Sequence, residues 1–185
     1  MTDLKTWTKT MLTVFNYLDR ICGAIDKLEM TQALGSFYAD SLHFSNNTMQ
    51  MSEKMMALTE KKVTLINLKI LVHDVLLSMD KNDAILLILK HLRYKKMEEI
   101  ANLMHCSPRS VFRKVSEAYD AFEKNLAEKN YSGEKLKKML QDESWILEVF
   151  NKYSKENTKN VYVFETVQVD PLSVSRYFKN ICKNG

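Results

Sequence analysis

The side chains best suited to chemistry in this sequence are basic and polar residues on one face of a helix expected from residue 108 onward. They are Arg109, Ser110, Phe112, Arg113 and Lys114. Arginine and lysine bind phosphate oxygens, and arginine is the usual reader of the O6 and N7 atoms of guanine. Serine contacts phosphate and phenylalanine contacts a thymine methyl group. This face therefore indicates double-stranded DNA as a partner.

The same helix has an apolar face that must pack inside the protein. Its inward positions recur with the period of an amphipathic helix. They are Val111, Val115, Ala118 and Phe122. Ser107 is a suitable N-cap because its hydroxyl accepts a backbone N–H, and Pro108 fits the first helical position, where no N–H is needed.

A shorter helix is expected just upstream, separated from the first by a tight turn. It runs from Met97 to Met104 and turns Ile100, Ala101 and Met104 inward. A small residue such as Ala101 allows two helices to cross closely. His105 follows at a position that needs a left-handed backbone, which histidine tolerates better than most residues.

These two helices resemble region 4 of sigma-70-type factors. The residues that match the region-4 pattern are Glu99, Ile100, Ala101, Met104, Ser107, Val111 and Val115. The resemblance implies a helix-turn-helix over residues 80–126 whose second helix enters the DNA major groove. With the long helices that precede it, the chain looks like the small sigma-region-4-like regulators of bacterial prophages. The alternative is an ordinary helical pair with a basic face.

A weaker copy of this pattern surrounds the second proline, Pro171. The segment that begins at Asp170 repeats an N-cap, a proline and the Ser-Val-x-Arg order of the first copy. Its outward residues are Ser173, Ser175, Arg176, Tyr177 and Lys179. They are the candidate DNA contacts of a second helix-turn-helix. The alternative is a helical tail, because the residues 161–164 are β-prone.

Two long amphipathic helices are expected before the first motif. The first carries an apolar seam at alternating intervals of three and four residues: Leu4, Trp7, Met11, Val14, Leu18, Ile21, Ile25 and Leu28. The second runs from about Ser52 to Met79, where Lys62 and Lys69 interrupt the apolar stripe. The pair forms a helical hairpin, whose seam is either core within one chain or a coiled coil that makes a homodimer.

Composition indicates that the whole chain is all-α. Its 185 residues include only four glycines and two prolines, too few for the turns of an all-β fold. We expect a helical hairpin at 1–79, the helix-turn-helix domain at 80–128 and a C-terminal helical unit at 129–185. The net charge of +4 permits a nucleic-acid partner, and all of the positive excess lies beyond residue 79.

No motif for catalysis, a metal or a cofactor appears in the sequence, so we do not expect an enzyme. The three cysteines are far apart and form no metal or disulfide framework. His73 and His91 lie on apolar helices and are expected to pack there. The longest apolar run, Ala84 to Leu89, is too short to span a membrane, and the N-terminus lacks a signal-peptide layout. We therefore expect a cytoplasmic protein.

The leading interpretation is a bacterial DNA-binding transcriptional regulator. The rival is a helical protein-interaction module that binds RNA polymerase or another regulator. Salt dependence distinguishes the two, because DNA binding by charge neutralisation weakens steeply with salt, whereas an apolar contact between helices does not.

Overall fold

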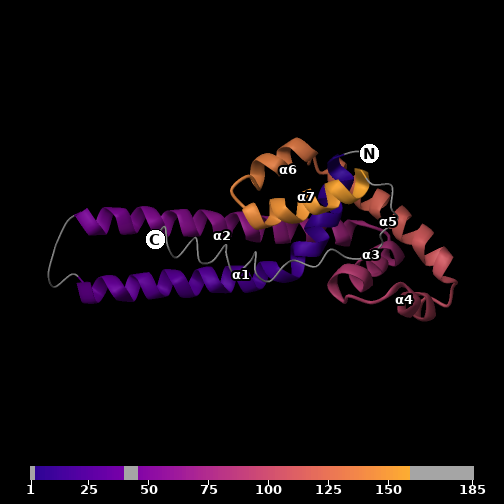
Figure 1. The fold of residues 1–185 in the computed structure, drawn as a ribbon, viewed down its shortest axis with the longest axis horizontal. Coiled ribbons are helices and arrows are strands. Elements are labelled where there is room, and N and C mark those ends of the chain that lie inside the picture. The colour runs from indigo at the N-terminus through magenta and orange to yellow at the C-terminus, as the bar shows by residue number, and fades with distance from the viewer. Residues whose placement is uncertain (1–2, 40–45, 159–185) are drawn as a thin grey trace.

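The computed structural model describes residues 3–39 and 46–158, and every regular element in these ranges is helical (Figure 1). In chain order the elements are α1 (Asp3–Ala39), α2 (Asn46–Ser78), α3 (Lys81–Leu87), the π-helical turn η1 (Ile88–Leu92), α4 (Met97–Leu103), α5 (Pro108–Glu128), α6 (Gly133–Met139) and α7 (Ser144–Thr158). The expected all-α fold is confirmed. None of these helices is both long and apolar enough to cross a membrane.

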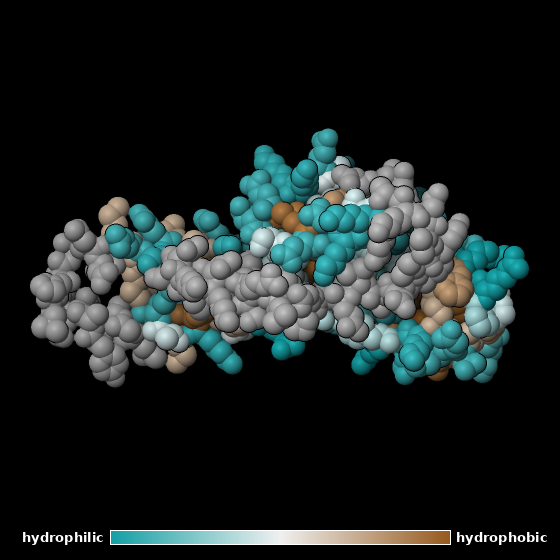
Figure 2. All heavy atoms as spheres, in the orientation of Figure 1, coloured by the Kyte–Doolittle hydropathy of each residue, from teal (hydrophilic) through white to brown (hydrophobic). Residues whose placement is uncertain are grey.

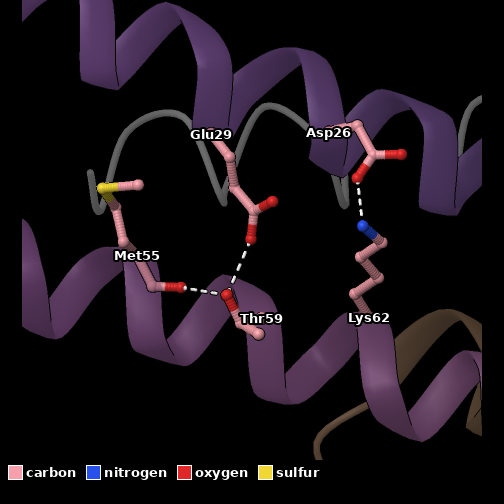
Figure 3. A network of polar contacts seen from close by, with 5 residues as sticks. All are labelled: Asp26, Glu29, Met55, Thr59 and Lys62. Carbon is pink, nitrogen blue, oxygen red and sulfur yellow. Dashed lines mark hydrogen bonds and ion pairs between the residues drawn. The ribbon is translucent and has the colours of Figure 1, made fainter.

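The helices α1 and α2 form a long antiparallel hairpin whose far end lies away from the other helices (Figure 1). Polar contacts on one flank fix how the two helices align (Figure 3). Lys62 of α2 pairs with Asp26 of α1, and the Thr59 hydroxyl donates a hydrogen bond of 2.8 Å to Glu29. The two lysines expected to interrupt the apolar stripe thus belong to the contact with α1, since Lys69 also pairs with it.

The apolar seam of α1 is core within the chain. Trp7, Met11, Val14, Leu18, Ile21 and Ile25 are buried, and Leu4 and Leu28 are half-buried. The interpretation of the seam as internal packing is confirmed, and these side chains are not exposed to a second copy. The buried side chains of the described residues form one continuous core that the hairpin shares with the later helices.

The first half of α1 is enclosed over residues 6–14, which are all buried except for the half-buried Lys9. Thr6, Thr8 and Thr10 are buried together with the seam residues beside them. The surrounding elements are η1, α5, α6 and α7, all of which contact α1. The ring of Trp7 packs on that of Phe150 in α7, with 4.3 Å between the ring centroids. This half of α1 is therefore the central helix on which η1, α5, α6 and α7 pack.

The apolar run from Ala84 to Leu89 belongs to α3 and to the π-helical turn η1 that follows it. Asp80 caps α3 by accepting the Asn82 N–H at 2.8 Å, as expected for an Asp at that place. The helix then changes to the π-helical spacing of η1, where the Arg93 N–H donates at 2.9 Å to the carbonyl of Ile88, five residues back. The Asn16 amide of α1 donates to the freed Leu92 carbonyl at 3.0 Å.

The helix α7 lies in the C-terminal unit that the sequence predicts to be helical. Its spaced apolar residues pack inward: Trp145, Ile146, Val149 and Tyr153 are buried, and Phe150 is half-buried. His91 is buried as expected, whereas His73 lies on the outside of α2 with 63% of its side chain exposed, so its expected packing role is wrong. The side of α2 that carries His73 faces solvent because α1 covers the opposite side of this helix.

Candidate nucleic-acid interface

The turn between α4 and α5 has the backbone that the sequence predicts. His105 has a φ of 50°, in the left-handed region that L-residues other than Asn, Asp and His rarely adopt. This conformation ends α4, because the Cys106 N–H then donates back to the Ala101 carbonyl at 3.0 Å. The predicted left-handed conformation of His105 is confirmed.

The start of α5 is fixed by its N-cap. The Ser107 hydroxyl accepts the Ser110 N–H at 3.2 Å, and Pro108 is the first residue of the helix. Both features are as predicted from the sequence. Ala101 is buried where α4 packs on α5, which is consistent with the expected close crossing of the two helices.

The predicted inward face of α5 is confirmed. Val111, Val115, Ala118 and Phe122 are fully buried, and Tyr119 and Leu126 extend the same face. On α4, Ile100 and Ala101 are buried and Met104 is half-buried. Because this packing fixes the rotation of α5 about its axis, it also decides which side chains face solvent.

The basic side chains at the start of α5 lie on the outer surface. Arg109 and Arg113 are exposed and Lys114 is half-buried. Arg113 has 74% of its side chain exposed and lies 3.6 Å from the Glu117 carboxylate. An exposed pair of this kind contributes little to stability, so the guanidinium can exchange Glu117 for another anion at small cost.

Two of the five predicted contact residues in α5 also have structural contacts. The Ser110 hydroxyl lies 2.9 Å from that of Ser107, so it completes the cap of the helix. Phe112 is half-buried and packs against the core. The structure thus leaves Arg109 and Arg113 as the exposed cations at the start of α5, with Lys114 half-buried beside Arg113 in the chain.

Three further basic residues precede α4 and were not among the predicted contacts. Arg93, Lys95 and Lys96 are accessible at the surface, and Lys96 is the N-cap of α4. Lys95 pairs with Glu99 one turn later at 2.9 Å. The signal was present in the sequence as a run of three cations within four residues, just before the first helix of the motif. In a helix-turn-helix this helix crosses the DNA backbone.

The candidate contacts of the second copy, Ser173, Ser175, Arg176, Tyr177 and Lys179, lie outside the described residues. The same holds for the β-prone residues 161–164. The second helix-turn-helix therefore stays a prediction.

A buried polar cluster lies beneath α5, where it meets α1 and η1. The His91 imidazole contacts the Tyr119 hydroxyl at 2.6 Å and the Thr13 hydroxyl at 3.3 Å. Burial, with Lys90 and Lys9 nearby, holds the pKa of His91 well below its usual value. Burial and Lys9 lower the pKa of Lys90 to about 8. Because this cluster is enclosed in the core, it supports α5 from below.

Among the described residues, no group of three histidine, cysteine or carboxylate side chains is placed to hold a metal ion. Comparison of the chain with protein-family models, curated proteins and solved structures finds no match. The assignment of a function therefore depends on the geometry and the charge of this surface.

Proposed function

We propose that this protein is a DNA-binding transcriptional regulator that places α5 in the major groove of double-stranded DNA. The observation that carries the proposal is the left-handed His105 between α4 and α5, with φ at 50°. This turn directs the N-terminal half of α5 outward while its apolar face stays in the core. A helix held in this way presents its first turns to base edges.

The distribution of charge supports the same interface. Arg109, Arg113 and Lys114 occupy the first two turns of α5, and Arg93 and Lys96 lie at the start of α4. In the proposed complex, the cations of α5 contact base edges and phosphates, and those beside α4 contact the adjacent backbone. The helices α4 and α5 lie at the end of the molecule opposite the C-terminal end of α1 and the N-terminal end of α2, so the hairpin helices do not extend across this surface (Figure 1).

One observation favours the rival, a module that binds RNA polymerase or another regulator. Leu103 and Tyr94 are exposed large side chains beside α4, with 57% and 48% of their surface accessible. Exposed apolar side chains in a protein interface bind by desolvation, which depends weakly on salt. The two functions are therefore separable by experiment.

The proposal is tested by selecting duplexes from a random DNA pool and titrating the selected duplex with two charge-matched variants. Arg109→Ala with Arg113→Ala removes two cations from the start of α5. Lys124→Ala with Lys129→Ala removes two cations from the other end of α5. Lys129 lies roughly 24 Å from Arg113 along the helix axis, at 1.5 Å per residue.

We expect the first variant to bind the selected duplex at least about 100-fold more weakly, and the second to change affinity by only a few-fold. Equal decreases in the two variants would show that total charge and not α5 sets the affinity. A pool from which no duplex is enriched would also contradict the proposal. Circular dichroism of both variants checks that the helices remain intact.

A further inference from the structure

The outer face of α2 carries a row of exposed apolar side chains at strict seven-residue intervals. This row, the outer stripe, consists of Met49, Met56, Val63, Ile70 and Leu77. Each of the five is between 50% and 71% exposed. The neighbouring Ile66 adds a sixth exposed apolar side chain. Apolar atoms reach the surface along the hairpin in Figure 2. Ordinary solvent-facing positions of a long helix are polar, so this pattern indicates a contact surface.

The outer stripe lies opposite the face of α2 that packs on α1. The inner residues Leu58, Leu65 and Val72 are buried and follow the outer residues by two positions. Two residues turn a helix by about 200°, so the two rows lie on opposite sides. A helix that is apolar on two opposite faces packs against two partners. In the described residues, α1 covers one of these faces.

The seven-residue interval defines what kind of partner fits the outer stripe. On a straight helix such a row drifts by about 20° per heptad, and a helix that supercoils around it follows this drift. The row from Met49 to Leu77 is roughly 42 Å long at 1.5 Å per residue. At its centre are Val63 and Ile70, with Ile66 between them at the d position of the heptad if the outer stripe is taken as the a position. β-Branched residues at the a position favour two-stranded parallel coiled coils.

We propose that the outer stripe binds the outer stripe of a second copy of this chain, with the two α2 helices parallel. The charges on its flanks fit this arrangement. Lys69 pairs with Asp19 of its own α1 at 2.6 Å and keeps 39% of its side chain exposed. In a parallel pair this exposed part lies on the flank that faces Asp74 of the other copy. An antiparallel pair places the carboxylates of Glu53 and Asp74 from different copies side by side, which is repulsive.

The parallel arrangement has a consequence that rests on the proposed function. The helix-turn-helix of each copy lies at the same end of the dimer, because α4 and α5 lie at the end of the molecule opposite the C-terminal end of α1 and the N-terminal end of α2 (Figure 1). A symmetric pair of recognition helices reads two half-sites related by a two-fold axis. The dimer itself is tested without DNA, so its failure leaves the proposed function untouched.

Sedimentation of the full chain over a wide concentration range tests the contact. The wild type is expected to reach twice the chain mass of 21.6 kDa. Val63→Glu with Ile70→Glu introduces charges into the stripe at exposed positions, so the helices should form while the dissociation constant rises at least about 100-fold. The control Ala57→Glu, an exposed change on another side of α2, should leave the dimer intact.

Oxidative cross-linking tests the orientation. In a background with Cys22, Cys106 and Cys182 changed to Ser, Ile70→Cys should give a disulfide-linked dimer, because equivalent residues meet in a parallel pair. A wild type that remains monomeric at high concentration overturns the proposal. The stripe would then be covered by a partner protein or by another segment of this chain. In an antiparallel pair Ile70 of one copy meets Met56 of the other. If a disulfide forms only when the Ile70→Cys and Met56→Cys proteins are mixed, the pair is antiparallel and the proposal is contradicted.

Discussion

The Nε2 atom of His91 lies 2.6 Å from the hydroxyl oxygen of Tyr119, at a point where four helical elements meet. His91 belongs to η1 and Tyr119 to α5. The cluster continues through Thr13 of α1, whose hydroxyl lies 2.8 Å from that of Tyr153 in α7. Because these groups are buried, each depends on the others for its hydrogen bonds. The cluster thereby fixes α5 relative to the central helix α1.

Because His91 is buried, we expect the free energy of unfolding to change with pH in the mildly acidic range. Its pKa is lowered mainly by burial, so the imidazole stays neutral in the folded protein. In the unfolded chain it binds a proton below about pH 6.5, so the free energy of unfolding falls as the pH drops through this value. We expect a decrease of up to about 1.4 kcal/mol per pH unit from this group, measured by urea unfolding between pH 7 and pH 5.

Two histidine variants assign this effect. His91→Gln keeps a side chain that donates and accepts hydrogen bonds but does not titrate, so it should show a flatter pH dependence. His73→Gln removes an exposed imidazole and should keep the slope of the wild type. An unchanged slope in His91→Gln would exclude His91 as its source.

The buried Lys90 has an effect of the same sign on the alkaline side, because its pKa is also lowered in the folded protein. Its pKa is about 8 in the folded protein and 10.5 in the unfolded chain, so the unfolded chain binds more protons between these values. The free energy of unfolding therefore rises from pH 8 towards pH 10, by about 3 kcal/mol at most. Above pH 10 the Tyr119 hydroxyl opposes this, since its raised pKa keeps it neutral only in the folded state.

Replacing Lys90 tests this origin. Lys90→Met removes the cost of the buried charge, so it should stabilise the protein at pH 7 by roughly 1–3 kcal/mol and abolish the rise above pH 8. The gain is reduced because the Lys90 ammonium lies 5.2 Å from the ring centroid of Tyr119, a favourable interaction that methionine does not make. The exposed Lys152→Met serves as the control. A rise that persists in Lys90→Met belongs to another group.

A glycine substitution tests the backbone conformation of the turn between α4 and α5. His105→Gly should leave the melting temperature unchanged or raise it, equivalent to about 0–1 kcal/mol, because glycine adopts a φ of 50° without strain. Leu103→Gly, two residues earlier in α4, should instead cost about 1 kcal/mol because it weakens a helix. If both changes destabilise equally, position 105 does not have the left-handed backbone.

Local signals in the sequence were sufficient for the turn and its flanking helices. The spacing of Ala101, His105 and Ser107 indicates a crossing, a left-handed residue and a cap, and each depends on residues close in the chain. The π-helical turn was not predictable in this way. Its hydrogen bond from Arg93 to Ile88 is accompanied by the side chain of Asn16, a residue more than seventy positions away.

The inner face of α2 could be predicted from the sequence, because Leu58, Leu65 and Val72 recur at seven-residue intervals, and these residues are buried. The outer stripe was not predicted, because the outward face of a long surface helix is normally polar. The burial of Lys90 was missed for a related reason, since a lysine within an apolar run normally extends its charge to solvent.

The salt dependence of DNA affinity tests the proposed function most directly. We predict that the logarithm of the binding constant for the selected duplex falls linearly with the logarithm of the salt concentration, with a slope of about −0.9 per neutralised phosphate. Arg113→Ala should weaken binding by about 1–3 kcal/mol if the arginine reads a base, and should make the slope shallower by about one unit if it neutralises a phosphate. Binding that does not change with salt, or that Arg113→Ala leaves unaltered in a folded protein, would contradict DNA recognition by α5.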